Sequence, residues 1–423
     1  MLDLKYIKNH SDEIQKNLIN RNVKLDWNDF IKTDKQRIEL QKKIDALKAE
    51  QHKANEEIVK LNKNDKQEKI GQMRAISGEI KNLEEEFKSI NDKFIYSLEQ
   101  IPNITHPDAP IGSSDKDNKE IEVVGKIPKQ NFSYLDHVAL GKKLDILDFE
   151  AGTKITGNKF YFLKREGALL ELALINYAIN TLVKKGFIPI ITPDMATKEI
   201  LKASGFNPRD DSDQIYNINN TSLSLIATAE ITIGGYHASE TLSDKKLPIK
   251  YVGLSHCFRK EAGTYGQESK GLYRVHQFTK IEMYIICLPE NSDKLHQELL
   301  ETEKELFTGL EIPFRVVDVC TGDLGGPAYR KYDLEAWMPM KKNYGEVTST
   351  SNCTDFQARR LNIRFVDKQG KKQFVHTLNG TAIAVSRALI AILENNQQKD
   401  GSVIIPKVLR PYMNNLEAIH SRK

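Results

Sequence analysis

Cysteine is scarce in this chain of 423 residues, which contains only four: Cys257, Cys287, Cys320 and Cys353. No two of them form a C-x-x-C pair. A disulfide framework or a zinc knuckle is therefore not expected, and a reducing, cytoplasmic compartment is the natural one.

Long apolar runs are also missing. Residues 1–20 lack the apolar stretch that a signal peptide needs, and no run approaches the roughly 20 residues of a membrane span. We therefore expect no membrane partner. The content of 39% hydrophobic and 28% charged residues fits a globular protein, and the length suggests two domains. The net charge of +4 permits a nucleic-acid partner without requiring one.

The two commonest nucleotide-binding motifs, G-x-G-x-x-G and G-x-x-x-x-G-K-[ST], do not occur. A bound nucleotide would need another scaffold. Strands are predicted around residues 223–228, 250–259, 274–286, 313–319 and 345–349, with helices over 165–185 and 381–395. Several connections are too short for crossover helices, which favours antiparallel pairing. The sequence therefore predicts an α+β fold built on an antiparallel sheet.

Two heptad runs stand out near the N-terminus, with Arg37 and Gln51 as polar exceptions and Asn64-Asp65 as a candidate turn. Each run forms one narrow apolar seam, typical of helices that pair with each other. We predict an antiparallel coiled-coil hairpin over about residues 30–98. The seam residues are Leu40, Ile44, Leu47, Ala54, Ile58 and Leu61, then Met73, Ile76, Ile80, Leu83, Phe87, Ile90 and Phe94.

Two interpretations of this hairpin are open. It is either an oligomerisation device or an arm that reaches along a large partner. In the second case exposed lysines would touch phosphates, but acidic residues are nearly as numerous, so charge does not decide. The lysines concerned are Lys42, Lys43, Lys53, Lys60 and Lys63.

The pattern breaks after Gln100 into a polar stretch with prolines. We predict three parts: an N-terminal domain over residues 1–110, a linker over 111–131 and a larger domain over 132–423.

The stretch from Phe258 to Tyr284 is unusual in composition. On a strand from residue 274, one face would carry cation, imidazole, aromatic, cation and acid. A solvated sheet face is one interpretation. The other is a ligand site, with a base stacked at one end, an ammonium group held about 13 Å away, and a phosphate between them on Arg259. The face residues are Arg274, His276, Phe278, Lys280 and Glu282.

Several motifs, in order, resemble class II aminoacyl-tRNA synthetases, and among them the seryl-tRNA synthetase family. FRKEAGTYGQESKGLYRVHQF resembles motif 2 and TAE resembles the serine-binding loop. GFIPIITPDM resembles motif 1, with Pro193 at a dimer interface. Two later segments resemble the remaining motifs, and the N-terminal hairpin matches the family's arm. These stretches are residues 258–278, 228–230, 186–195, 346–360 and 376–397.

The resemblance implies a serine–tRNA ligase activity in two steps. L-Serine and ATP would give seryl-adenylate and pyrophosphate, and the seryl group would pass to the 3′ end of serine tRNA. It also implies Mg²⁺, a homodimer, and a long tRNA variable arm lying against the hairpin, with no DNA partner. Whether selenocysteine tRNA is also charged stays undecided.

Roles follow from the resemblance position by position. Arg259, Arg387 and Glu282 would be catalytic, and Glu346 with Ser349 would contact Mg²⁺. The serine carboxylate is itself the nucleophile, so no side-chain nucleophile is expected. The implied serine-binding residues are Thr228, Ala229, Glu230, Arg259, Glu282 and Thr381. The implied ATP-binding residues are Arg259, Lys260, Glu261, Arg274, Val275, Phe278, Glu346, Val347, Thr348, Ser349 and Arg387.

The motif 2 loop departs from the family's basic-Asp-Thr-Arg-Gly pattern. Here it is Gln267-Glu268-Ser269-Lys270-Gly271, which weakens the expectation of loop contacts. Three rivals stay open: a class II enzyme for another amino acid, a paralogue that charges a carrier protein, and a non-enzymatic coiled-coil scaffold.

Overall fold

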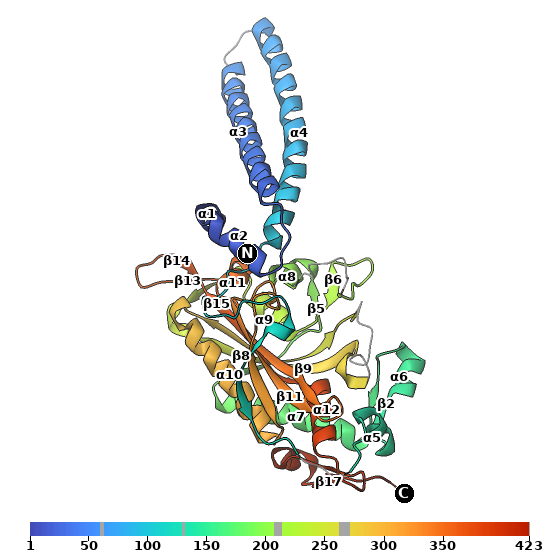
Figure 1. Cartoon of the computed structure of the whole chain (residues 1–423). Coiled ribbons are helices and arrows are strands. Elements are labelled where there is room, and N and C mark those ends of the chain that lie inside the picture. Colours follow the sequence, from blue (N-terminus) through green and yellow to red (C-terminus); the bar gives the residue numbers. More distant parts are fainter. Residues whose placement is uncertain (60–62, 129–131, 207–213, 262–270, 423) are drawn as a thin grey trace. The chain divides into compact units, whose positions relative to one another are not determined.

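The computed structural model describes residues 1–59, 63–128, 132–206, 214–261 and 271–422 (Figure 1). It divides into two compact units, one of residues 3–102 and one of residues 1–2 with 103–423. Lys60, Leu61 and the Gln267–Lys270 segment lie outside the described residues, as does the side chain of Lys63. The three predicted parts, 1–110, 111–131 and 132–423, stay a prediction. Within the described ranges, no helix combines the length and the apolar character needed to cross a membrane.

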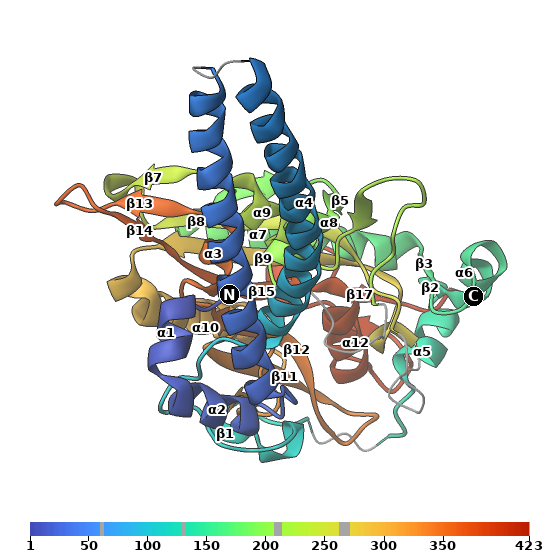
Figure 2. The same cartoon turned by 90° about the horizontal axis from the view of Figure 1, so that it is seen from above.

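The unit of residues 3–102 consists of helices. The predicted coiled-coil hairpin is confirmed, and its two long helices run side by side in both views (Figure 1, Figure 2). The turn was predicted wrongly, because Asn64 and Asp65 belong to the second long helix. Asp65 lies in its first turn, where an acidic side chain complements the helix dipole. The helices are α1 Leu4–Asn9, α2 Ser11–Asn20, α3 Trp27–Ile58 and α4 Lys63–Gln100.

The seam of the hairpin explains its two polar exceptions. Arg37 lies over the ring of Phe94, 4.7 Å from its centre, and Gln51 Nε2 donates to Ser77 Oγ on α4 at 2.7 Å. Both polar side chains therefore have partners across or along the seam. The buried apolar residues are Phe30, Leu40, Ile44 and Ala54 on α3, and Met73, Ile80, Phe94 and Leu98 on α4.

The other unit is built around an eight-stranded sheet in the order β1-β10-β11-β12-β15-β9-β8-β4. Every pair is antiparallel except β4–β8, so the predicted α+β class is confirmed. Strand β1 lies within the segment predicted as a linker. The strands are β1 Lys119–Val124, β4 Ile188–Ile191, β8 Ile249–Phe258, β9 Gln277–Cys287, β10 Phe314–Asp318, β11 Arg330–Met338, β12 Asn343–Asn352 and β15 His376–Ala384.

Helices and smaller sheets flank this sheet. Helix α7 follows the predicted span and ends before Gly186, whose φ of 84° suits a helix terminus. The helices are α5 His137–Lys143, α6 Phe149–Thr156, α7 Arg165–Lys184, α8 Lys198–Ala203, α9 Ala229–Tyr236, α10 Ser292–Gly309, α11 Phe356–Leu361 and α12 Val385–Asn395. The short strands are β2 Leu147–Asp148, β3 Phe162–Leu163, β5 Met195–Thr197, β6 Leu223–Leu225, β7 Thr241–Ser243, β13 Arg364–Val366, β14 Lys372–Phe374, β16 Val403–Ile404 and β17 Ala418–Ile419.

The two faces of β9 serve different purposes. Ile281 and Met283 pack into the main core together with residues of α7, α10 and α12. On the other face, Tyr284 and Ile286 pack with α9 and α11. The remaining even-numbered positions, Phe278, Lys280 and Glu282, are left for a cavity.

Three local predictions were wrong. Strand β9 begins at Gln277, so Arg274 lies before it, and β8 ends at Phe258, so Arg259 follows it. Thr381 belongs to β15, not to the last helix, which begins at Val385. Thr381 pairs with Glu282 of β9, and this pairing extends β15 as far as Ala384. The apolar spacing of this part of the sequence is also compatible with a helix, which explains the error.

Candidate active site

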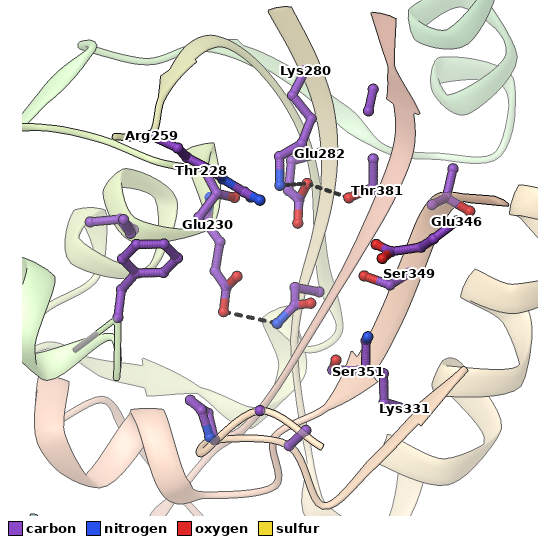
Figure 3. A pocket seen from close by; sticks show the side chains of 18 of the residues that line it. Thr228, Glu230, Arg259, Lys280, Glu282, Lys331, Glu346, Ser349, Ser351 and Thr381 are labelled. Carbon is purple, nitrogen blue, oxygen red and sulfur yellow. Dashed lines mark hydrogen bonds and ion pairs between the residues drawn. The ribbon is translucent and has the colours of Figure 1, made fainter. Parts of the chain in front are cut away.

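A cavity of about 470 Å³ opens over the polar positions of β9. Figure 3 shows Arg259 on one side of it and Glu346 on the other, with Glu282 between them. The structure thus brings together residues that are far apart in the sequence. The predicted site residues that line the cavity are Thr228, Glu230, Arg259, Glu261, Val275, Phe278, Glu282, Glu346, Val347, Thr348, Ser349, Thr381 and Arg387.

Three predicted site residues are not part of this lining. Ala229 is fully buried behind it, at the start of α9. Lys260 lies with its amino group 5.8 Å from the ring centre of Tyr216. Arg274 Nη1 is 3.1 Å from Glu261 Oε2, so it holds a carboxylate that does line the cavity.

Arg259 lies over the ring of Phe278, with its guanidinium carbon 5.4 Å from the ring centre. Its Nη2 donates to the carbonyl oxygen of Ala227 at 3.4 Å, a long hydrogen bond. Its Nε is buried and has no hydrogen-bond partner among the described residues. A half-buried guanidinium whose Nε has no partner among the described residues is suited to an anionic ligand.

Glu282 is held by two neighbours. Lys280 Nζ lies 2.6 Å from Glu282 Oε2, and Thr381 Oγ1 donates to the same oxygen at 3.2 Å (Figure 3). The side chains of Lys280 and Glu282 are only 7% and 2% exposed, so the pair is fixed and shielded from water. The second carboxylate oxygen is left for a ligand group such as an ammonium.

Glu230 forms a second acidic position in the cavity. Its Oε1 accepts from Gln357 Nε2 at 2.5 Å and from Asn379 Nδ2 at 2.8 Å. Burial, and next the charge of Glu282, raise the pKa of Glu230 to about 7, although the two amide donors oppose the shift. Glu230 therefore exchanges a proton near neutral pH, unlike an ordinary glutamate.

A β-bulge places Glu346 and Ser349 on one face of β12. Glu346 pairs with Glu335 on β11 and Ser349 pairs with Asp333, while Val347 between them has no partner. Glu335 and Asp333 are two residues apart and share a face, so their partners do too. Regular alternation would have put Glu346 and Ser349 on opposite faces.

Arg387, in the first turn of α12, reaches Glu346. Its Nη1 lies 3.1 Å from Glu346 Oε1 and donates to the Glu346 carbonyl oxygen at 3.0 Å. Burial raises the pKa of Glu346, but the charges of Arg387, Lys331 and Arg259 outweigh it and hold that pKa at about 2. Glu346 is therefore ionised at any working pH.

The cavity lies where two strands separate. Strands β12 and β15 pair through Thr350–Asn352 and Leu378–Gly380 only. Beyond these three pairs, Glu346 and Ser349 lie on one side of the opening and Thr381 on the other (Figure 3). The contact between Arg387 and Glu346 joins the two sides again at the far end.

Several residues in or behind the cavity lining were not assigned a role from the sequence, among them Gln357, Lys331, Ser351 and Asn379. Gln357, fully buried, donates to Glu230 and to the Ser204 carbonyl oxygen. Lys331 and Ser351 line the cavity as partners across β11 and β12. Asn379 lies two residues before Thr381 on the same face of β15, but the sequence analysis placed Thr381 on a helix, so strand alternation did not lead to it. Lys331 depends on a strand pairing that the sequence does not reveal.

Two known families match the chain. The seryl-tRNA synthetase N-terminal domain matches residues 1–105, and the tRNA synthetase class II core domain (G, H, P, S and T) matches residues 214–396. The serine–tRNA ligase of Treponema denticola is 52% identical over 415 residues, which cover 97% of this chain and 98% of that protein. The serine–tRNA ligase of Dictyoglomus turgidum is 49% identical, with 98% of both chains covered.

Two solved structures are also similar over the whole chain. The seryl-tRNA synthetase of Pyrococcus horikoshii complexed with ATP has a TM-score of 0.89 and 42% identity, with 100% of both chains covered. The cytoplasmic serine–tRNA ligase of Naegleria fowleri in complex with AMP has a TM-score of 0.83 and 31% identity, and covers 100% of this chain and 99% of its own.

Proposed function

Because the chain belongs to the seryl-tRNA synthetase family, we propose that its cavity activates L-serine with ATP and then transfers the seryl group to the 3′ end of serine tRNA. The chain is thus an aminoacyl-tRNA ligase of class II. The first step joins the serine carboxylate to the α-phosphorus of ATP and releases pyrophosphate. The second step joins the seryl carbonyl to a ribose hydroxyl of the tRNA and releases AMP.

The observation that carries this proposal is the state of Arg259. Its buried Nε has no partner among the described residues, and its ring partner Phe278 offers a surface on which adenine can stack. In this arrangement Arg259 would contact the α-phosphate while Phe278 supports the base. Glu261, held by Arg274 at 3.1 Å, would accept from the exocyclic amine of adenine.

The serine end of the site is proposed to lie between Glu282 and Glu230. The ammonium group would bind the free oxygen of Glu282, whose other oxygen is taken by Lys280 and Thr381. Thr228 caps α9 and would contact the same substrate. A site that hydrogen-bonds the serine hydroxyl disfavours alanine, because a buried polar group is then left unpaired.

Glu346 and Ser349 fit the proposed Mg²⁺ contacts. Mg²⁺ in phosphate-transfer sites usually takes one or two carboxylates, with phosphate oxygens and water completing its shell. Glu346 stays ionised, and the bulge sets Ser349 on the same face. Among the described residues no group of three or more His, Cys, Asp or Glu is suited to a metal ion, so the phosphates of ATP would complete this site. The ion would neutralise charge on those phosphates.

The proposed chemistry needs positioning and charge rather than a side-chain nucleophile. The serine carboxylate attacks the α-phosphorus in line with the departing pyrophosphate. Arg259 would stabilise charge on the α-phosphate oxygens, and Arg387 would bind the γ-phosphate and help pyrophosphate leave. The aminoacyl transfer would be left to the substrates' own groups, since the reacting ribose hydroxyl would lie next to the phosphate of the adenylate.

The α3–α4 hairpin is proposed to read tRNA. Lys42, Lys43 and Lys53 are exposed on α3. Helical RNA is recognised mainly by its shape and backbone, which suits an arm of mixed charge without an aromatic platform. The long variable arm of serine tRNA is the feature it would contact.

A homodimer is also proposed, through the edge of the sheet at β4. Ile191 is 81% exposed there, and Ile188 and Met195 are also exposed, with Pro193 beside them. Exposed apolar side chains on an edge strand commonly mark an interface. The four unpaired, buried cysteines support the proposed cytoplasmic location, since thiols stay reduced there.

Serine-dependent exchange between ATP and radiolabelled pyrophosphate tests the function. Serine should support exchange and alanine or threonine should not; exchange driven by another amino acid would contradict the proposal. Aminoacylation of serine tRNA excludes a carrier-protein paralogue. Glu282→Gln keeps the shape but removes the charge, so the KM for serine should rise about tenfold or more while the KM for ATP stays unchanged.

A further inference from the structure

A buried histidine outside the cavity is bonded on both ring nitrogens. His137, the first residue of α5, has Nδ1 2.9 Å from Glu394 Oε1 on α12. Its Nε2 lies 3.1 Å from the backbone nitrogen of Leu272. His137 and Glu394 are both buried, so these bonds are sheltered from water. None of these three residues has a role in the function proposed above.

The partners fix the protonation state of His137. A backbone N–H can only donate, so Nε2 must accept and carries no proton. Nδ1 therefore carries the proton and donates it to Glu394. The other oxygen of Glu394 accepts from the backbone nitrogen of Met340 at 3.2 Å. The imidazole is thus a neutral bridge between α12 and the backbone at Leu272.

The backbone at Gly271 is adapted to this bridge. Gly271 has a φ of 67°, a conformation that favours glycine, and a Cβ there would lie 2.1 Å from His137 Nε2. Leu272 is fully buried. The short helical turn Gly271–Tyr273 is therefore held in one place by the histidine.

That turn leads back to the cavity. Tyr273 lines the cavity, and Arg387 lies over its ring, 5.2 Å from the centre. Arg387 and Glu394 are seven residues apart on α12, two turns along the same side of the helix. The contacts thus close a circuit from Arg387 along α12 to Glu394, through His137 to Leu272, and by Tyr273 back to Arg387.

We propose that His137 is a positioning residue for ATP: through Leu272 and Tyr273 it fixes the guanidinium of Arg387 at the phosphate end of the cavity. The inference rests on the proposed function, which assigns the γ-phosphate to Arg387. His137 touches no substrate; it acts on Arg387 through the Tyr273 ring, and its bond to Glu394 anchors it to the helix that carries Arg387. Its removal therefore affects ATP and leaves serine binding intact.

Two substitutions separate the two bonds. His137→Asn puts an amide near the place of Nδ1, so it keeps the bond to Glu394 and loses the one to Leu272. His137→Gln puts an amide oxygen near the place of Nε2 and can accept from Leu272. In serine-dependent pyrophosphate exchange, His137→Asn should raise the KM for ATP about tenfold, as expected for a lost buried hydrogen bond, with the KM for serine unchanged. His137→Gln should recover most of the loss.

His237 provides a matched control. It is also buried, with Nδ1 2.8 Å from Glu240 and Nε2 2.9 Å from the Tyr251 hydroxyl, but it does not line the cavity. His237→Asn should lower the melting temperature without a selective change in the KM for ATP. Arg387→Lys combined with His137→Asn should be no worse than Arg387→Lys alone, because both act at one guanidinium.

The outcomes separate the two hypotheses. If the unmodified chain shows no serine-dependent exchange, the proposed function fails. If it exchanges normally and folded His137→Asn keeps the original KM for ATP, or raises both KM values equally, the inference is overturned. Should His137→Asn not fold, Tyr273→Leu tests the other end of the circuit: a rise in the KM for ATP alone supports the inference, and an unchanged KM overturns it.

Discussion

The Lys48–Glu84 pair of the α3–α4 hairpin and the Lys280–Glu282 pair of the cavity have the same nitrogen–oxygen distance, 2.6 Å. Their surroundings differ. The first two side chains are 53% and 48% exposed, while the second two are 7% and 2% exposed. An exposed pair gains little from its contact because water screens it, but a buried pair depends on it.

This contrast extends to both regions as a whole. The hairpin is stabilised by one apolar seam, and its charged side chains are exposed to water. Substitution of any one of these charged side chains should therefore change its stability little. In the cavity Lys280 is paired with Glu282, and Arg387 with Glu346. Removal of one member of such a pair leaves the other without its counter-charge. We therefore expect the hairpin to act through many weak contacts and the cavity through a few strong ones.

The largest expected effect comes from removal of most of the hairpin. Residues 42–88 are replaced by a short flexible linker. This replacement leaves in place the stacked rings of Phe30 and Phe94, whose centres are 5.3 Å apart. Charging of serine tRNA should fall by about 100-fold or more, because the contacts that position tRNA go with the arm. Pyrophosphate exchange should persist with unchanged KM values for serine and ATP.

Both half-reactions are measured on one preparation whose oligomeric state is known from ultracentrifugation. A truncated dimer that charges tRNA normally would show that the arm does not read tRNA. A monomer that has also lost exchange would instead favour the oligomerisation interpretation.

Arg387→Lys probes the strong contacts and ranks second. Lysine keeps the positive charge but lacks the planar guanidinium, whose Nη1 contacts both a carboxylate oxygen and the carbonyl oxygen of Glu346. Adenylate formation should slow by about 10- to 100-fold in single-turnover experiments. Transfer from preformed seryl-adenylate to tRNA should be nearly unchanged, since pyrophosphate has already left; equal slowing of both steps would contradict the assignment.

The raised pKa of Glu230 predicts a smaller effect that depends on pH. With a pKa of about 7, the carboxyl is neutral in acid and gains its charge as the pH rises. An ammonium ligand prefers the charged form, so the KM for serine should fall about tenfold from about pH 6 to about pH 8. Glu230→Gln should abolish this dependence.

Stability should change in the opposite direction from serine binding. Between its ordinary pKa of 4.5 and about 7, Glu230 holds more protons in the folded chain than in the unfolded one. The contribution of this group to the free energy of unfolding therefore decreases as the pH rises through that window. Chemical denaturation at several pH values, with Glu230→Gln as the reference, checks the sign.

The smallest effect is expected for Lys48→Met, which breaks the exposed pair with Glu84. Its contribution to the free energy of unfolding should be below about 1 kcal/mol. Urea denaturation followed by circular dichroism measures it. A loss above about 2 kcal/mol would remove the distinction between the two regions.

The sequence was sufficient to predict the two paired helices of the hairpin, the polar face of β9 and most of the residues that line the cavity. Heptad spacing predicted which side chains meet in the seam, and alternation on β9 placed Phe278, Lys280 and Glu282 together. Motif resemblance added Arg387 and Glu346, which lie far from β9 in the chain.

What the sequence did not reveal depends on long-range pairing. Lys331 reaches the cavity only because β11 pairs with β12, and Gln357 only because α11 packs near Glu230. The bulge at Val347 is likewise invisible in the local pattern, although it decides where Glu346 points. Thr381 was placed on a helix for the same reason, since its strand is defined by its partner on β9.

The short pairing of β12 with β15 has a mechanical consequence. The strands up to β12 and the strands from β15 onward are joined by only three residue pairs. At the open end of the gap, the contact between Arg387 and Glu346 is a further link between the two parts. A change of angle at these three pairs would therefore be expected to alter the gap between Ser349 and Thr381. A ligand that binds Arg387 in place of Glu346 would break the contact that joins the two parts of the sheet. Contacts between the ligand and both parts would then have to set the width of the gap.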